Sequence, residues 1–583
     1  MSMTVNESPA LLAARAADSL VLQCLTENQS FLLEAGAGAG KTYSLIEALR
    51  HLIATQGQEL RRHNQRVACI TYTNAATAVI NSRIDNSPLV FTDTIHAFCW
   101  SLIKGFQPTL RAGVAKLEAW QERLAEVGDI GRRAVEYDLG HRRTTDDFIS
   151  LHHNDVLDLT VSLLPVEKFQ IILTAKYPFI LIDEYQDTNF AVVEAIKSHL
   201  LGQKGRPLIG LFGDHWQRIY EETCGQIVHP ALKEIGKGAN FRSSTSIVGV
   251  LNAMRPELPQ GVKDETFGGS AAVYHTNRWS GTRRTGAGGG HWTGDLPSDV
   301  AHHCLKGLVA SLQAEGWDFA PDKTKVLMLT HNVLASEQGY SNLLRVFPYT
   351  DQVIKKENDH IAFFADKLEP ACDAFGRRRY GEMFEIFRDA TPDLGSHSEK
   401  ARWSKAMTDL VTLRLTGTIG DVVDHITRSG YPTLPDSILR REGEAKVPAG
   451  DAEEPSESVQ QTRRLRAIAY REMIALDQFI DGHTPFATKH SVKGDEFENV
   501  LVVVGRGWNR YNFGQYLELA ATPEKVAADR RDSFERNRNL FYVACSRPTT
   551  RLAVIFTQLL SNSALQTLRQ WFGTDAVHDF DPS

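Results

Sequence analysis

Short apolar runs that end in polar turns alternate along the chain with stretches of helical periodicity. One set of runs lies at residues 31–33, 66–70, 179–182 and 208–212, and a second set lies at 325–329, 500–504 and 552–556. Buried strands of parallel sheets covered by helices have this pattern. The sequence therefore predicts an α/β protein with two cores, and the 583 residues are enough for about three or four domains.

The loop after the first run has the composition of a phosphate-binding turn. Residues 35–42 read Ala-Gly-Ala-Gly-Ala-Gly-Lys-Thr and lead into a stretch of helical periodicity. Backbone N–H groups of such a turn cradle phosphates, so we expect Lys41 to reach the β- and γ-phosphates of ATP and Thr42 to hold Mg²⁺. A small-residue turn with a chance Lys-Thr pair is the alternative interpretation. The candidate phosphate-binding residues are Gly36, Ala37, Gly38, Ala39, Gly40, Lys41 and Thr42.

A second motif supplies the acidic groups that an ATPase needs. The apolar run 179–182 ends in Asp183 and Glu184. A carboxylate at a strand end can hold Mg²⁺, and we assign this role to Asp183. Glu184 is the candidate base that orients or deprotonates the attacking water. A buried strand that merely ends in solvated acids is disfavoured by the phosphate-binding turn upstream.

Charge and cysteine content restrict the class of protein only loosely. The net charge of −7 is not typical of nucleic-acid binders, but a motor that tracks single strands needs only a basic groove. Seven scattered cysteines without a Cys-x-x-Cys pair predict a reduced, cytoplasmic protein. No apolar run approaches the roughly 18 residues of a membrane helix, and residues 1–9 do not have the pattern of a secretory signal.

Two segments have compositions typical of irregular structure. Residues 281–294 contain repeated glycines and predict a flexible loop, whereas residues 441–461 are rich in Glu, Pro, Gly and Ser and predict a flexible acidic linker.

Six further motifs occur in a fixed order along the chain. They are Ile-Thr-Tyr-Thr-Asn-Ala-Ala at 70–76, Thr-Ile-His-Ala-Phe at 94–98, Gly-Asp-His-Trp-Gln-Arg-Ile-Tyr at 213–220, Asn-Phe-Arg-Ser at 240–243, Thr-Lys-His-Ser-Val-Lys-Gly-Asp-Glu-Phe at 488–497 and Tyr-Val-Ala-Cys-Ser-Arg at 542–547. Together with the phosphate-binding turn and the acidic motif, this ordered set resembles the UvrD/Rep family of superfamily 1 helicases. The resemblance spans residues 35–547.

The resemblance implies further roles at the nucleotide. Gln217 would sense the γ-phosphate, and Arg242 and Arg547 would be arginine fingers donated from the second core across a cleft, where a guanidinium can neutralise the transferring phosphoryl group. Phe241 matches an aromatic that stacks on adenine, and Glu496 matches a carboxylate that contacts the ribose. Tyr43 stands where the family usually has an arginine that sandwiches the adenine.

The resemblance also implies a path for DNA. Residues matching positions that contact the strand are Thr73, Asn74, His96, Thr488 and His490. Tyr72 and Tyr220 match aromatics on which bases stack. Alternatively, Tyr72 and Phe241 are core aromatics and His96 is a satisfied interior histidine. Trp216 either stacks on a base or only supports its loop.

Family members contain two RecA-like motor cores with mainly helical accessory domains inserted in them. By this resemblance, the first core would comprise residues 1–100 and 174–238, and the second 239–344 and 476–583. The accessory domains would be residues 101–173 and 345–475. Both inserts are short for the family, and this compact form looks like the helicase subunits of two-gene antiphage systems such as Gabija.

Two functions follow as hypotheses. The first is an ATP-dependent motor that moves 3′ to 5′ on single-stranded DNA and unwinds duplexes. The second is a DNA-end-sensing ATPase subunit that regulates a separate nuclease partner without processive unwinding. Both use ATP and Mg²⁺, and both fit a role in antiviral defence.

Overall fold

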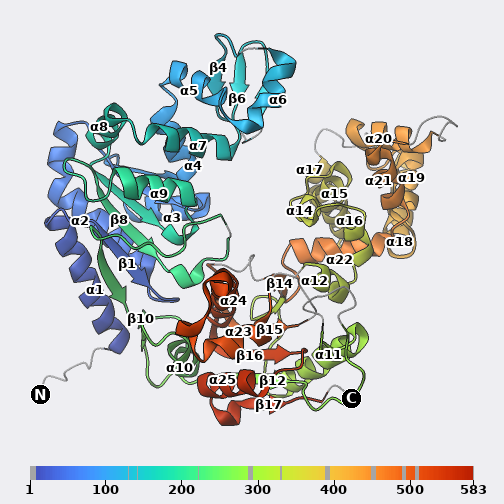
Figure 1. Cartoon of the computed structure of the whole chain (residues 1–583). Coiled ribbons are helices and arrows are strands. Elements are labelled where there is room, and N and C mark those ends of the chain that lie inside the picture. Colours follow the sequence, from blue (N-terminus) through green and yellow to red (C-terminus); the bar gives the residue numbers. More distant parts are fainter. Residues whose placement is uncertain are drawn as a thin grey trace, which may run out of the picture. The chain divides into compact units, whose positions relative to one another are not determined.

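The computed structural model confirms an α/β protein (Figure 1). It describes residues 8–128, 130–138, 140, 142–220, 222–285, 293–328, 331–387, 394–447, 455–488, 494–505 and 511–581. By its packing, the chain divides into two compact units. Unit 1 comprises Met1–Val273, Arg510–Ala553 and Leu560–His578, and unit 2 comprises Tyr274–Asn509, Val554–Leu559 and Asp579–Ser583.

A six-stranded parallel sheet with the order β3-β2-β7-β8-β1-β9 forms the centre of unit 1. Its strands are β1 (Phe31–Ala35), β2 (Val67–Thr71), β3 (Val90–Thr94), β7 (Phe179–Asp183), β8 (Leu208–Gly213) and β9 (Lys233–Lys237). Four of these strands coincide within a residue or two with apolar runs of the sequence. The parallel pairing agrees with those runs, which are apolar on both faces.

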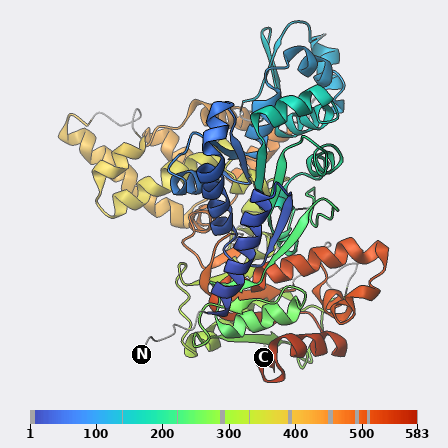
Figure 2. The same ribbon diagram turned by 90° about the vertical axis from the view of Figure 1, so that its left-hand side faces the viewer.

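Side chains of the sheet alternate between two hydrophobic cores. Along β1, Phe31 and Leu33 pack into one core, whereas Leu32 packs into the other. The hydrophobic core that contains Phe31 and Leu33 is covered by α1 (Pro9–Thr26), α2 (Lys41–Arg62) and α3 (Asn74–Arg83). The hydrophobic core that contains Leu32 is covered by α4 (Ile95–Ile103), α7 (His153–Leu163), α8 (Glu167–Lys176) and α9 (Phe190–His199). Figure 2, seen from the side of α1 and α2, shows these two helices in front of the sheet. This arrangement leaves the sheet covered on both faces, as predicted.

Unit 1 also contains α10 (Thr245–Met254) and three helices from the C-terminal part of the chain, α23 (Phe513–Ala520), α24 (Ala528–Cys545) and α25 (Asn562–Phe572). A short parallel pair, β10 (Ala239–Asn240) and β11 (Gly261–Val262), flanks α10 in sequence.

A second six-stranded sheet has the order β14-β13-β15-β16-β12-β17. Its strands are β12 (Ser270–His275), β13 (Thr324–Met328), β14 (Phe486–Thr488), β15 (Phe497–Val504), β16 (Pro548–Phe556) and β17 (Val577–Asp579). β13 pairs in parallel with both β14 and β15. The three later apolar runs of the sequence correspond to β13, β15 and β16. α11 (Ser298–Ala314) lies between β12 and β13 in the sequence.

The first predicted insert, residues 101–173, contains α5 (Gln107–Val114) and α6 (Glu118–Val127) together with α7 and α8. It also contains a small sheet that the sequence did not predict, formed by β4 (Ala134–Glu136), β5 (Arg143–Thr144) and β6 (Phe148–Ser150). These strands have two or three residues each, too few for a periodicity to be recognised. Asp155 of α7 anchors this part: it accepts a hydrogen bond from the Trp120 indole at 2.9 Å and pairs with Arg142 at 2.6 Å.

The regular elements in the described part of residues 345–475 are helices. They are α14 (Thr350–Ile354), α15 (Asp359–Phe363), α16 (Glu369–Gly376), α17 (Tyr380–Phe387), α18 (His397–Thr416), α19 (Ile419–Ser429), α20 (Asp436–Lys446), α21 (Glu457–Arg466) and α22 (Tyr470–Ile480), and α12 (His331–Gln338) and α13 (Ser341–Arg345) precede them. Glu369 joins three of them, because it accepts a hydrogen bond from Tyr470 at 2.7 Å and pairs with Arg414 at 2.7 Å.

One linker prediction requires correction. Residues 441–446 form the end of α20, and residues 457–461 form the start of α21. Helix α20 is held because Glu442, buried in it, bonds with His360 and Arg466; composition alone gives no sign of these partners. Residues 448–454 of the predicted linker, and residues 286–292 of the predicted glycine-rich loop, lie outside the described residues.

Among the helices that the structure describes, none is both long and apolar enough to cross a membrane.

Candidate nucleotide site and strand groove

The order of the sheet brings three functional loops to one edge. Strands β7, β8 and β1 are consecutive in the sheet, and their register pairs Asp183 with Phe212 and Glu34 with Gly213. The glycine-rich loop follows β1, a helical turn (Tyr185–Asp187) follows β7, and another turn (His215–Gln217) follows β8. Ligands of parallel α/β sheets bind at this carboxyl edge. The loops therefore meet where a nucleotide is expected.

The glycine-rich loop is tightly packed, and its glycines are required at two positions. Gly38 and Gly40 have φ values of +72° and +76°, a region that favours glycine. A Cβ atom on Gly38 would lie 2.7 Å from Asn240 Oδ1 and 2.9 Å from Arg242 Cβ. The amide nitrogen of Asn240 donates to the Ala37 carbonyl at 3.1 Å, which fixes the loop. The loop is therefore held directly against the segment that carries Arg242.

The lysine and the two acids of the predicted site lie together. Lys41 begins α2, and its Nζ lies 3.2 Å from Glu184 Oε2. Burial alone would lower the pKa of Lys41, but the carboxylates of Glu184, Asp214 and Asp183 raise it, so the side chain is cationic. Burial and the negative charge of Glu184 raise the pKa of Asp183 to about 7.

The surroundings of Asp183 fit a divalent cation. Its Oδ1 atom is buried and has no hydrogen-bond partner among the residues that the structure describes. A buried carboxylate oxygen without a partner is costly, and it is a preferred ligand of Mg²⁺. Thr42, the second residue of α2, is the predicted hydroxyl ligand. The residues present are therefore those that a Mg²⁺ site requires.

The backbone of Glu184 is unusual. Its φ of 47° places a residue with a long side chain in the left-handed region, an uncommon conformation that is enriched at functional sites. Gln186 fixes the side chain, because its amide nitrogen donates to Glu184 Oε2 at 2.6 Å while its Oε1 accepts from the backbone N–H of Asp214 at 3.0 Å. The candidate base thus has a defined position at the end of β7.

Gln217 and both predicted arginine fingers belong to the same unit as Lys41. Arg547 Nη2 donates to Gln217 Oε1 at 3.4 Å, and Arg242 Nη1 donates to the carbonyl of Ser546 at 3.3 Å. Burial and the neighbouring charge of Arg242 lower the pKa of Arg547 to about 10. The sequence placed both arginines on the second core, whereas in the structure their segments pack with the glycine-rich loop in unit 1. Two adjacent guanidiniums favour a bound polyanion.

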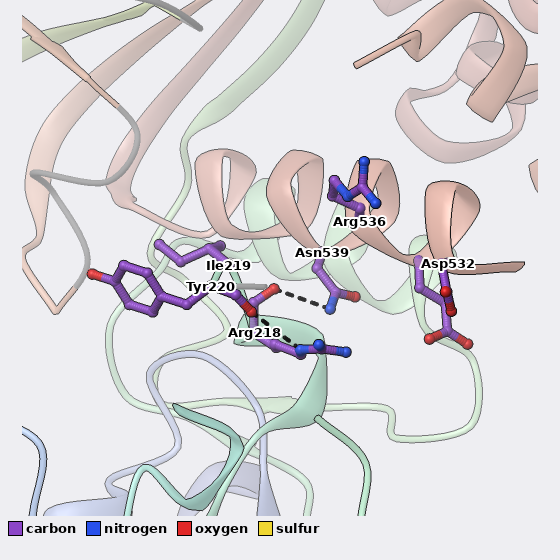
Figure 3. A pocket seen from close by; sticks show the side chains of 7 residues that line it. Arg218, Ile219, Tyr220, Asp532, Arg536 and Asn539 are labelled. Atoms are coloured by element: carbon purple, nitrogen blue, oxygen red, sulfur yellow. Dashed lines mark hydrogen bonds between the residues drawn. The ribbon is translucent and has the colours of Figure 1, made fainter. Parts of the chain in front are cut away.

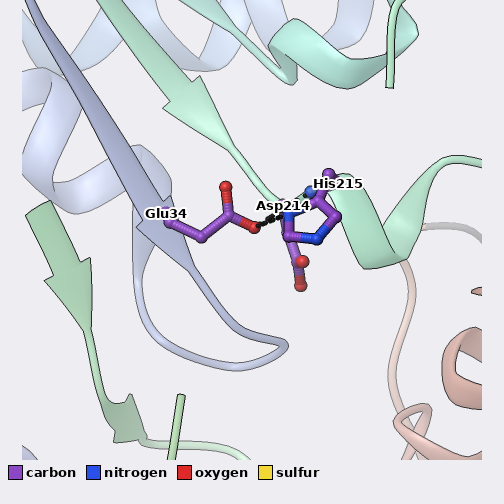
Figure 4. Close-up of side chains that lie close together, drawn as sticks. All are labelled: Glu34, Asp214 and His215. Carbon is purple, nitrogen blue, oxygen red and sulfur yellow. Dashed lines mark hydrogen bonds and ion pairs between the residues drawn. The ribbon is translucent and has the colours of Figure 1, made fainter. Parts of the chain in front are cut away.

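A buried charge network beneath the loop was missed by sequence reasoning. Glu34 at the end of β1 pairs with His215 (Figure 4), and 2.7 Å separate Glu34 Oε1 from His215 Nδ1. Arg255 bridges Glu34 at 2.9 Å and Asp214 at 2.7 Å. Burial would raise the pKa of Glu34, but His215 and Arg255 lower it to about 2. Glu34, Asp214 and His215 are spaced as metal ligands could be, but the Arg255 guanidinium already supplies the positive charge. Only Asp214 and His215 lay in a recognised motif.

Tyr43 and Phe241 flank the end of the glycine-rich loop. A Cβ atom built on Gly40 would lie 3.9 Å from Phe241 Cδ2 and 3.9 Å from Tyr43 Cβ. Phe241 is 36% exposed and Tyr43 is 55% exposed, so neither ring is a core aromatic. Two exposed rings beside a phosphate-binding loop are suited to stack on a base. Glu496, the predicted ribose contact, is exposed and lies in unit 2.

Three of the predicted strand-contacting residues line one cavity of about 380 Å³ in unit 1: Tyr72, His96 and Tyr220. The rings of Tyr72 and Tyr220 stack with centroids 5.6 Å apart, and Tyr72 is 45% exposed, which excludes a core position for it. Burial and the neighbouring His153 and His152 lower the pKa of His96 to about 4. The structure thus brings these side chains together, and we name this cavity the strand groove.

The other predicted contacts are distributed as follows. Thr73 caps α3 by accepting a hydrogen bond from Ala76 N at 3.2 Å, and Asn74 begins the helix; both are exposed. Thr488 is the last residue of β14 in unit 2, and His490 lies outside the described residues. Trp216 is buried, so it supports its loop and is not a free base platform.

Comparison with known proteins agrees with this geometry. The sequence profile of a family described as an AAA domain matches residues 19–223. Gabija protein GajB from Bacillus cereus (strain HuB5-5) is 23% identical over 92% of this chain and 94% of its own length. ATP-dependent DNA helicase Rep from Buchnera aphidicola is 28% identical over 38% of this chain and 40% of its own. ATP-dependent DNA helicase PcrA from Staphylococcus epidermidis is 23% identical over 43% of this chain and 42% of its own length.

The parallel sheet and the loops at its carboxyl edge agree with these matches, and the chain is similar to the ATP-dependent DNA helicases Rep and PcrA over about two fifths of its length. A similarity to GajB, a Gabija protein, extends over almost the whole chain.

Proposed function

We propose that the chain is a DNA-dependent ATPase that moves along single-stranded DNA in the 3′-to-5′ direction. The observation that carries this proposal is the convergence of Lys41, the two acids, the buried Arg547 and the partly buried Arg242 near one glycine-rich loop. Phosphoryl transfer spreads negative charge over the transferring oxygens, and prearranged cations stabilise that charge. Lys41, Arg242 and Arg547 supply such cations at this site.

Each side chain then has a defined task. Lys41 binds the terminal phosphates, which replace Glu184 as its partner. Glu184, freed from the ion pair and still held by Gln186, orients the attacking water and accepts its proton. Asp183 and Thr42 hold Mg²⁺, which shields the phosphate charge.

Gln217 and the two arginines complete the site on the side of the γ-phosphate. Arg547 Nη2 is already 3.4 Å from the side-chain Oε1 of Gln217, so one phosphate can contact both side chains. Binding of that phosphate would relieve the repulsion between Arg242 and Arg547. Tyr43 and Phe241 are proposed to hold the base between them, and Glu496 to contact the ribose.

The strand groove is proposed to bind single-stranded DNA. Tyr72 and Tyr220 now stack on each other, and a base that takes the place of one ring as the partner of the other keeps the stacking energy, which is about 1–3 kcal/mol per base. Thr73 and Asn74 at the N-terminus of α3 are suited to a phosphate. Thr488 and His490 would continue the path on the second core.

A second candidate function is a DNA-end-sensing ATPase that regulates a separate nuclease partner in antiviral defence. It is favoured by the extent of the matches, because the similarity to the Gabija protein covers 92% of the chain whereas that to Rep covers 38%. The chemistry of ATP hydrolysis is the same in both proposals, so only an assay of movement separates them.

Strand displacement on tailed duplexes tests the choice. A motor of the proposed direction unwinds a duplex with a 3′ single-stranded tail and leaves a 5′-tailed or blunt duplex intact. Lys41→Ala serves as the inactive control. ATP hydrolysis stimulated by DNA ends without displacement of either tailed duplex would instead support the sensing function.

A further inference from the structure

Helix α24 contacts the loop that connects the nucleotide site with the strand groove. The loop, residues 213–220, contains Gln217 at the nucleotide side and Tyr220 in the groove. Asn539 of α24 is buried, and its amide nitrogen donates to two carbonyls of the loop, those of His215 at 3.0 Å and Arg218 at 3.1 Å. The two carbonyls lie on either side of Gln217 in the sequence.

We propose that Asn539 is a positioning residue that couples the occupancy of the nucleotide site to the position of Tyr220. This inference rests on the proposed function. Asn539 touches neither nucleotide nor DNA in the arrangement described above; it acts on the backbone that carries Gln217 and Tyr220. Figure 3 shows it projecting from α24 toward the loop, with the hydrogen bond to Arg218 drawn.

The orientation of the Asn539 amide is fixed by its neighbour. Arg538 Nε donates to Asn539 Oδ1 at 3.0 Å, so the oxygen faces Arg538 and both amide hydrogens face the loop. Arg538 in turn lies over the ring of Trp216, with 4.3 Å between its Cζ atom and the ring centroid. An aspartate at position 539 would keep the partner of Arg538 but would lose both donors to the loop.

At the C-terminal end of the loop, the side chain of Arg218 holds the backbone of Tyr220. Its Nε donates to the Tyr220 carbonyl at 3.2 Å and to Thr223 Oγ1 at 3.3 Å. Beside it, a cavity of about 200 Å³ is lined by residues 218–220 and by α24 residues that include Asn539. The loop therefore has a firm connection to the helix at Asn539 and free volume next to Tyr220.

The same helix leads into Arg547, two residues beyond its end, and Arg547 donates to Gln217. A γ-phosphate that draws Gln217 and Arg547 together moves the loop relative to α24. When Asn539 holds the carbonyls of His215 and Arg218, a displacement of Gln217 also moves residues 218–220. Without these hydrogen bonds, Gln217 can move while Tyr220 keeps its position.

The chain offers a matched control on the same helix. Asn537 is also buried, but its amide bonds with Asn512 N at 2.9 Å and with the Ser533 carbonyl at 2.7 Å, and neither group belongs to the loop. Asn539→Asp, Asn539→Ala and Asn537→Ala can therefore be compared for ATP turnover with and without single-stranded DNA. Thermal unfolding of each variant gives the accompanying loss of stability.

We expect both Asn539 variants to lose at least fivefold of the stimulation by DNA, while basal turnover falls less than threefold. Asn537→Ala should keep the stimulation although it melts at a lower temperature. Wild-type stimulation in Asn539→Asp, or an equal loss in Asn537→Ala, would overturn the positioning role.

Hydrogen exchange separates this inference from the proposed function. In the full-length protein, a non-hydrolysable ATP analogue with Mg²⁺ should change the exchange of the Arg218–Tyr220 amides, and Asn539→Asp should abolish that change. If wild-type turnover does not respond to DNA, the proposed function fails, but the exchange result still decides the role of Asn539. An unchanged nucleotide response in Asn539→Asp would refute it.

Discussion

At the scale of single residues, the candidate nucleotide site combines a buried carboxylate with two neighbouring guanidiniums. Asp183 Oδ1 is buried without a hydrogen-bond partner among the described residues, and Arg547 is buried beside Arg242. A buried carboxylate oxygen without a partner is costly, and two adjacent like charges repel each other, so both features favour a bound ligand. A metal-bound polyphosphate has the required charges, with the cation at Asp183 and the anion at the arginines.

The assignment of the base predicts the phenotype of one variant. Glu184→Gln should reduce ATP turnover on the order of 10³-fold, because an amide cannot accept the proton of the attacking water. Binding of ATP should persist, since Lys41 loses a competing partner. Turnover measured by phosphate release and binding measured with a labelled nucleotide would check this. Glu194→Gln, which alters a surface pair with Lys197, is the control; wild-type turnover in Glu184→Gln would refute the assignment.

His96 predicts a pH dependence of stability. Its pKa is about 4 in the folded chain and about 6.5 when unfolded, so the unfolded chain takes up the proton first as the pH falls. The contribution of neutral His96 is therefore complete above pH 6.5 and is lost between pH 6.5 and pH 4. Urea unfolding of the wild type and His96→Gln at pH 7.5 and pH 5 measures the difference. The variant should lose less stability on acidification; an equal loss would contradict a half-buried His96 that stays neutral in the folded chain.

Residues with local signatures were predictable from the sequence, and residues that act through tertiary contacts were not. Lys41, Asp183 and Glu184 follow from a glycine-rich turn and an acidic strand end, which are contiguous patterns. Arg255, just after the end of α10, and Asn539, within α24, act on loops distant in sequence, and neither residue type carries a local sign of its partner.

At the scale of elements, the glycine-rich loop depends on its packing against residues 239–262. Gly38→Ala should weaken nucleotide binding at least tenfold, because the new Cβ atom meets Asn240 and Arg242 and the residue has a φ of +72°. Gly249→Ala in α10, where a Cβ atom meets nothing within 4 Å, is the control and should bind nucleotide normally. Isothermal titration with an ATP analogue compares them; normal binding by Gly38→Ala would contradict the described loop geometry.

The elements themselves show where sequence patterns are informative. Four apolar runs predicted strands of the first sheet because a strand covered on both faces is continuously apolar. Strand β9 was missed, since its sequence, Lys-Glu-Ile-Gly-Lys, is polar and it lies at the edge of the sheet. Residues 441–446 were taken as a linker, although Glu442 holds them in a helix through distant partners.

At the scale of the whole molecule, a motor requires that nucleotide and strand respond to each other. The nucleotide site and the strand groove lie in one compact unit and are joined by the loop of residues 213–220. That loop is short, so a change at Gln217 and a change at Tyr220 are physically linked. We therefore expect the two sites to be coupled, whether the protein unwinds DNA or senses DNA ends.

Coupling can be measured as the steady-state rate of ATP hydrolysis with and without saturating single-stranded DNA in the presence of Mg²⁺. DNA should increase turnover at least tenfold, and Lys41→Ala should abolish turnover in both conditions. Hydrolysis that requires Lys41 but is unchanged by DNA would contradict the coupling of the two sites.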